Sequence, residues 1–102
     1  MIARVWRGWT TLENADAYEE LLREYILPGI HRVTGFHGAY VLRQDGESET
    51  AFVVMTLFES LEAVRGFAGD SYTTPVIEPE ARVLLSRFEE VANHYEIKVS
   101  PE

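Results

Sequence analysis

The sequence predicts an α+β fold of the ferredoxin-like type, with the element order βαββαβ and an antiparallel four-stranded sheet. Segments rich in β-branched and aromatic residues alternate with segments whose apolar residues recur every three or four positions. Glycine, proline and one Asp-Gly pair separate these segments. The length of 102 residues suits one domain, so residues 1–102 are expected to form a single unit without a linker.

The first strand is expected over Ile2–Trp9, where β-branched and aromatic residues dominate, and the pair Thr10-Thr11 is expected to turn. An amphipathic helix follows from the N-cap Asn14, because apolar residues at positions 15, 18, 22, 25 and 26 share one face. Pro28 has no N–H to donate, so the helix should kink or restart there and continue to about residue 33. Gly35 suits the end of this turn.

Two strands, over 36–43 and 50–58, flank the pair Asp45-Gly46, which is typical of a hairpin turn. Ser60 is a good N-cap for a second helix over 61–68, and Gly69 provides its stop. Residues 70–78 form a loop, after which Pro79 begins a short helix through residue 85. The last strand is expected over 88–99.

The strand over 50–58 is apolar on both faces, although the helices of a ferredoxin-like unit cover only one face of its sheet. A second cover is therefore expected. In so small a chain, the commonest solution is a two-fold homodimer with sheet facing sheet.

The composition excludes several classes of function. Nine basic and 17 acidic residues leave a net charge of −8, which argues against nucleic acid and anionic membranes as partners. The absence of cysteine excludes disulfides and thiolate chemistry. No leader pattern stands at the N-terminus and the apolar run Ala51–Phe58 is too short to span a membrane, so a soluble cytoplasmic protein is expected.

Four stretches carry a family resemblance: Met1–Gly8 (MIARVWRG), Asn14–Tyr18 (NADAY), Ser60–Asp70 (SLEAVRGFAGD) and His94–Glu96 (HYE). With them the chain resembles, over nearly its whole length, the antibiotic biosynthesis monooxygenase family of dimeric α/β-barrel proteins. The resemblance implies a dimer whose two sheets form a barrel, with a cavity between sheet and helices in each subunit. Such relatives include cofactor-free oxygenases of polycyclic phenols, quinol oxygenases and haem-degrading enzymes.

The haem-degrading branch typically has an Asn on its first strand and a Trp and a His around its second helix. Here residues 2–9 contain no Asn, the helix over 61–68 contains Phe67 but no Trp, and residues 68–93 contain no His. The cofactor-free branch places Asn, Trp, Tyr and Arg around a phenolic ligand, and Trp6, Tyr72 and Arg82 match three of these residue types. No GxGxxG or P-loop is present either, so no cofactor is expected.

The expected function is that of a cofactor-independent monooxygenase-like protein that binds a planar phenolic or quinol-like molecule. His94 is the candidate base, because a neutral imidazole can take a phenolic proton near pH 7. Arg82 is the candidate stabiliser of the resulting anion. The aromatic walls are expected to come from Trp6, Tyr40 and Tyr72, with open space for a flat ligand where Gly8 lies beside Trp6.

Each assignment has a structural alternative. His94 can serve as a hydrogen-bonded structural residue, Trp6 as ordinary core, and Arg82 as a surface partner of Glu78 or Glu80. The histidines His31, His37 and His94 stand in no metal-ligand spacing, so no metal site is predicted. Two other functions also stay open: a non-catalytic small-molecule-binding or dimerisation module, and an isomerase or lyase that uses the same base without dioxygen.

Overall fold

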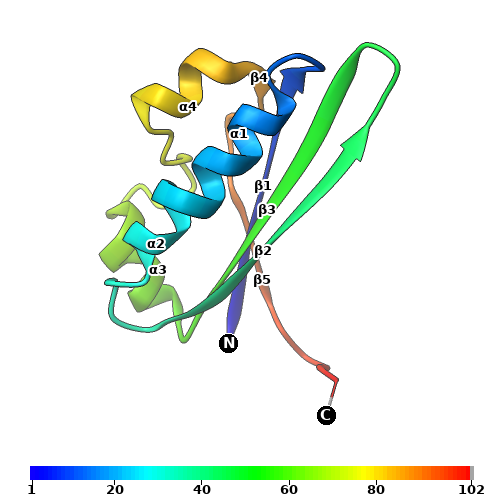
Figure 1. The fold of residues 1–102 in the computed structure, drawn as a ribbon. Helices are drawn as coiled ribbons and strands as arrows, with labels where there is room; N and C mark the ends of the chain where they lie inside the picture. Colours follow the sequence, from blue (N-terminus) through cyan, green and yellow to red (C-terminus); the bar gives the residue numbers. More distant parts are fainter. Residues whose placement is uncertain (102) are drawn as a thin grey trace.

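An antiparallel sheet organises residues 1–101, which the computed structural model describes. Its strands are β1 (Ile2–Thr11), β2 (Phe36–Asp45), β3 (Glu49–Phe58), β4 (Leu85–Phe88) and β5 (Asn93–Glu96). The order is β2-β3-β1, and β4 and β5 pair one after the other with the remaining edge of β1. The described helices all lie on one face of this sheet (Figure 1). The predicted α+β, ferredoxin-like fold is confirmed.

The first strand is two residues longer than predicted, and the expected turn at Thr10-Thr11 is wrong. Thr10 pairs with Thr50 of β3, and both side chains are fully buried. A β-branched residue is favoured in such a cross-strand pair, so β1 continues. The hairpin strands also extend beyond their predicted ends, because the turn is confined to residues 46–48 and the Gly46 N–H donates to the Glu49 carbonyl at 2.8 Å.

The helical segment after β1 restarts at the predicted proline. It consists of α1 (Ala15–Leu21), the π-helix η1 (Leu22–Ile26) and α2 (Leu27–Ile30). The N–H of Leu27 donates to the carbonyl of Leu22, five residues earlier. This wider turn directly precedes Pro28, whose missing N–H would interrupt a regular α-helical ladder. Helix α2 ends at Ile30, before the predicted end near residue 33.

The two remaining helices begin where predicted. In α3 (Leu61–Ala68), the Ser60 hydroxyl accepts from the Ala63 N–H at 3.2 Å, and Gly69 ends the helix with a φ of 85°. The last helix, α4 (Pro79–Leu84), ends one residue early, because residue 85 belongs to β4.

The single last strand predicted over 88–99 is wrong, because the chain leaves the sheet after Glu89, whose N–H still donates to the Arg7 carbonyl of β1. The buried Ala92 donates its N–H to the Thr73 carbonyl at 2.7 Å. The Glu89 carbonyl accepts from the indole N–H of Trp6, also at 2.7 Å. These bonds tie residues 89–92 to the loop after α3 and to the Trp6 side chain. Two short strands replace one long strand.

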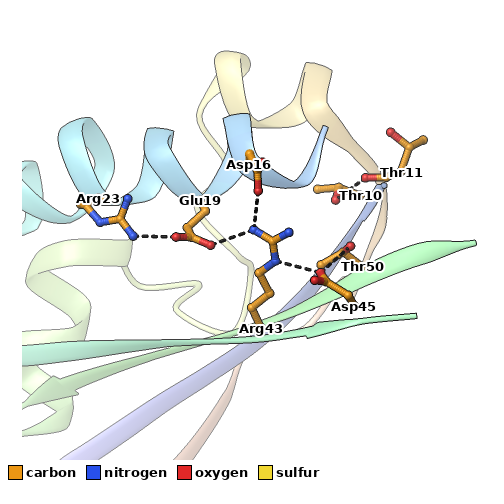
Figure 2. Close-up of polar contacts among 8 residues, drawn as sticks. All are labelled: Thr10, Thr11, Asp16, Glu19, Arg23, Arg43, Asp45 and Thr50. Atoms are coloured by element: carbon orange, nitrogen blue, oxygen red, sulfur yellow. Dashed lines mark hydrogen bonds and ion pairs between the residues drawn. The ribbon is translucent and has the colours of Figure 1, made fainter. Parts of the chain in front are cut away.

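Arg43 of β2 fastens α1 to the sheet. Its guanidinium donates to Asp16 and Glu19 of α1 and to Asp45 of its own strand, at 2.8, 2.9 and 2.8 Å (Figure 2). Hydrogen bonds from Arg23 and Arg43 lower the pKa of Glu19, and bonds from Arg43 and Thr50 lower that of Asp45. The network is exposed to solvent, so it contributes little to the free energy of unfolding, and its main effect is to position α1. It holds α1 over the sheet.

The two faces of the sheet differ. On the helix side, Tyr18 of α1 meets Phe52 edge to face with ring centroids 4.8 Å apart, and Phe58 stacks on Phe67 of α3 at 5.7 Å. On the other face, Tyr40 and Leu42 of β2 are 62% and 51% exposed.

No helix in residues 1–101 is long and apolar enough to cross a lipid bilayer.

Candidate functional site

A cavity of about 440 Å³ lies between the sheet and the helices. Its floor comes from Arg4 and Trp6 of β1 and from Val54 and Thr56 of β3. Residues of α1, η1 and α2 cover it, and Phe67 of α3 and the loop segment 75–78 close its sides. Most lining side chains are apolar. The volume falls in the range of about 300–1,000 Å³ that is usual for small-molecule sites.

Arg4 is the buried charge in the cavity floor, with only 5% of its surface exposed. Its Nη1 donates to the Tyr72 carbonyl and lies 2.9 Å from Nε2 of His94, and its Nη2 donates to the Thr74 carbonyl at 3.2 Å. Its guanidinium carbon lies 5.5 Å from the centre of the Phe67 ring. Burial lowers the pKa of Arg4, yet arginine keeps its charge at neutral pH.

This cation has no acidic partner. Among residues 1–101, no carboxylate oxygen lies within ion-pair distance of Arg4. Glu78 and Glu80 also line the cavity, but both residues are exposed. Inside the protein, the positive charge therefore faces neutral acceptors only.

The contact with Arg4 determines the protonation state of His94 and which ring nitrogen carries the proton. Arginine can only donate, so Nε2 of His94 must accept, which places the imidazole proton on Nδ1 and leaves the ring neutral. Burial and the charge of Arg4 both lower the pKa of His94. The ring of Tyr72 meets His94 edge to face with centroids 5.0 Å apart. His94 and Tyr72 contact Arg4 but do not line the cavity themselves.

Trp6 lines the cavity, as the sequence suggested, but the expected open space at Gly8 is wrong. A Cβ at Gly8 would meet Leu85 at 2.9 Å and the Trp6 ring at 3.0 Å. Gly8 therefore makes room for the indole itself rather than for a ligand. The hydrogen bond from the Trp6 indole to Glu89 fixes the orientation of the ring.

Two predicted site residues lie elsewhere. Tyr40 is on the open face of the sheet, because its neighbour Val41 packs on the helix-side core and successive side chains of a strand alternate. Arg82 is on α4, outside the cavity lining, with its guanidinium carbon 5.5 Å from the Phe88 ring centre. Among residues 1–101, Arg82 forms no ion pair with Glu78 or Glu80.

Sequence reasoning missed Arg4 and Tyr18. The available signal for Arg4 was an arginine two positions before Trp6, and hence on the same face of a strand. Tyr18 lines the cavity and is 1% exposed, and burial raises the pKa of its phenol, which stays protonated.

The lining contains no histidine, the residue that commonly ligates haem iron in proteins. In the part of the chain that the structure describes, no three His, Asp or Glu side chains gather to hold a metal ion.

The chain was compared with protein families, curated proteins and solved structures. Residues 1–72 match the family model described as antibiotic biosynthesis monooxygenase. No curated protein matches the chain. Among solved structures, a proposed antibiotic biosynthesis monooxygenase from Bacillus cereus is similar, with a TM-score of 0.69, 17% identity and coverage of 99% of this chain and 96% of that one.

Two further structures share the fold. A proposed antibiotic biosynthesis monooxygenase from Deinococcus radiodurans has a TM-score of 0.70 and 14% identity, covering 100% of this chain and 97% of its own. The haem-degrader MhuD of Mycobacterium tuberculosis, with two haems bound in its active site, has a TM-score of 0.64 and 17% identity, with 100% of both chains covered.

Replacing His94 should weaken the pH dependence of stability. The folded protein lowers the pKa of His94 below the value of about 6.5 in the unfolded chain, so the unfolded chain binds this proton more readily. The free energy of unfolding should therefore fall as the pH drops below that value. In His94→Gln, whose amide oxygen can still accept from Arg4, this part of the loss should be absent.

Denaturant midpoints near pH 8 and near pH 5 measure the effect. His37→Gln, at an exposed position of β2, is the matched control and should keep the pH dependence of the parent. A His94→Gln protein that loses as much stability as the parent between these pH values would contradict the assignment.

Proposed function

Because this chain belongs to the antibiotic biosynthesis monooxygenase family, we propose that it binds a planar phenolic or quinol-like molecule in the cavity and oxidises it with dioxygen, without a bound cofactor. One observation supports this most: the apolar cavity has a flat indole and a buried guanidinium side by side in its floor. The indole offers a stacking surface, and the buried guanidinium favours an oxygen anion beside it.

On this proposal Arg4 stabilises the substrate anion, the role that the sequence suggested for Arg82. A phenol that loses its proton beside Arg4 leaves a negative oxygen next to a fixed positive charge, which makes deprotonation easier. The apolar walls bury the rest of the ring. Arg82, outside the cavity, has no position from which to do this.

His94 remains the proposed base. Its Nε2 is unprotonated and directed at Arg4, the group that would hold the anion. His94 lies outside the cavity lining, so this proposal requires the substrate hydroxyl to enter between Arg4 and His94. The hydroxyl then gives its proton to Nε2 and leaves its oxygen on the guanidinium. The structural alternative is that His94 only orients Arg4.

The chemistry needs no external reductant. The electron-rich ring of the anion forms a carbon–oxygen bond with dioxygen, and the O–O bond then breaks. One oxygen stays as the second carbonyl of a quinone, and the other leaves as water with the ring hydrogen and the hydroxyl proton. Dioxygen takes up four electrons in total, and the substrate supplies all of them.

We expect 1,5-dihydroxynaphthalene, a planar phenol, to be converted to 5-hydroxy-1,4-naphthoquinone with one dioxygen consumed per substrate. Labelled dioxygen should deliver one labelled atom to the quinone. The His94→Gln enzyme should turn over about 10²- to 10⁴-fold more slowly if His94 is the base. Quinone formation without dioxygen uptake would reject this reaction.

The same experiment separates the alternatives. Anaerobic conversion to a rearranged or cleaved product indicates an isomerase or lyase. A ligand-induced rise in melting temperature without turnover indicates a binding module. Full activity in folded His94→Gln protein removes His94 from the chemistry.

We also propose a two-fold homodimer through the open face of the sheet. Tyr40, Leu42 and Tyr95 leave 62, 51 and 57% of their surface exposed there, beside the apolar side chains of β3. So many exposed apolar groups on a face without helices favour a second copy as cover (Figure 1). Tyr40 then belongs to this interface rather than to the cavity.

Sedimentation at micromolar concentration should give about twice the chain mass of 11.6 kDa. Leu42→Asp should shift the protein to monomer, because dimerisation would bury an unpaired charge. Val83→Asp is the matched control, since Val83 on α4 is 80% exposed and lies on the helix side. A stably folded parent that sediments as a monomer would reject the dimer.

A further inference from the structure

Arg4 has donors that the protein leaves unused. A guanidinium carries five N–H groups. Nη1 is directed at the Tyr72 carbonyl and at His94, and Nη2 at the Thr74 carbonyl. This leaves the Nε–H and one N–H of Nη2 without a hydrogen bond to any of residues 1–101.

The unused Nε–H is accessible rather than sealed by packed atoms. In residues 1–101, no fully buried side-chain nitrogen or oxygen lacks a hydrogen-bond partner. Nε has no such partner, so it must be accessible, and the accessible space beside Arg4 is the cavity that it lines. The buried cation thus has an accessible Nε–H beside the cavity, and the adjacent Nη2 has one N–H that no residue of 1–101 accepts.

We propose that the cavity binds an aromatic molecule through a carboxylate, held by Arg4. A carboxylate has two coplanar oxygens that match a pair of guanidinium N–H groups, whereas a phenolate offers one. It is also ionised at neutral pH without help from the site, so it enters as a ready partner for the charge. The inference rests on the proposed function, because it assumes that the cavity holds the ring, and it narrows the substrate class to hydroxylated aromatic acids.

The other charges of the cavity do not compete with this pairing. Glu78 and Glu80 line it too, but they are exposed, and water screens their repulsion of an anion. No acidic side chain in residues 1–101 stands close enough to Arg4 to neutralise it. The ligand therefore supplies the only carboxylate at the guanidinium.

A purely structural Arg4 is the main alternative. Its bonds to the carbonyls of Tyr72 and Thr74 tie the loop after α3 to β1, and that role alone would explain its burial. A structural role predicts that loss of Arg4 affects stability but does not alter which ligands the cavity prefers. The preference between matched ligands is therefore the informative quantity.

Titration calorimetry at neutral pH with three probes tests the proposal. 1-Hydroxy-2-naphthoic acid carries the carboxylate, its methyl ester has the same ring and hydroxyl without the charge, and 1-naphthol lacks the group altogether. We expect the acid to bind at least about tenfold more tightly than either neutral probe, the factor that charged hydrogen bonds commonly contribute. Arg4→Gln should reduce this preference to below about threefold.

Two further variants control for charge and for folding. Arg32→Gln removes one positive charge from an exposed position and should keep the full preference. Arg4→Lys keeps the charge but not the planar pair of donors, so an intermediate preference is expected. If Arg4→Gln does not fold, the parent's ratio of acid to ester affinity and the Arg4→Lys value still decide.

The outcomes distinguish failure of the carboxylate proposal from failure of the proposed function. If the parent binds the ester or 1-naphthol as tightly as the acid, the carboxylate proposal is overturned while the aromatic cavity stands. If the acid preference survives unchanged in folded Arg4→Gln protein, Arg4 is not its source and the proposal is likewise overturned. If none of the probes binds at millimolar concentration, the proposed function fails together with this inference.

Discussion

The guanidinium of Arg4 lies in the floor of an apolar cavity, where it has lost most of its water and meets only neutral acceptors. An arginine charge in such a place is costly unless its N–H groups are paired. The pairing comes from parts of the chain far apart in sequence: Tyr72 and Thr74 in the loop after α3, and His94 on β5. Burying this one charge therefore brings a sheet edge and a loop together at the cavity.

The loop after α3, the interruption between β4 and β5, and the position of Trp6 are all linked to the cavity floor around Arg4. The loop that accepts from Arg4 also accepts the Ala92 N–H, and the segment that includes Ala92 interrupts the last strand. The neighbouring Glu89 carbonyl holds the Trp6 indole, which lies in the cavity floor beside Arg4. The irregular backbone between β4 and β5 thus positions a cavity side chain. Arg43 bonds Asp16 and Glu19 of α1 (Figure 2), and α1 contributes residues to the cavity lining.

The fold could be predicted because each regular element has a local signal. Ser60 and Gly69 bracket α3, and Pro28 stands where the helix restarts. The site was harder to predict from the sequence than the fold. Tyr72 and His94 meet Arg4 only through long-range packing that no local pattern encodes. Arg82 and Tyr40 match the expected site by residue type alone, and strand alternation places Tyr40 on the opposite face of the sheet. The broken last strand depends on bonds to Thr73 and Trp6 that lie outside its own sequence.

A neutral His94 accepts a hydrogen bond from the buried, charged Arg4, and the Arg4 Nε–H is left to face the cavity. Nitrogen-15 NMR of the labelled protein at neutral pH tests it most directly, because it distinguishes the protonated nitrogen of each imidazole ring. The account predicts that the His94 proton resides on Nδ1, that Nε2 is unprotonated, and that the Arg4 Nε–H resonance shifts when 1-hydroxy-2-naphthoic acid is added. A proton on Nε2 of His94, or an Arg4 resonance unchanged at saturation with the acid, would contradict it.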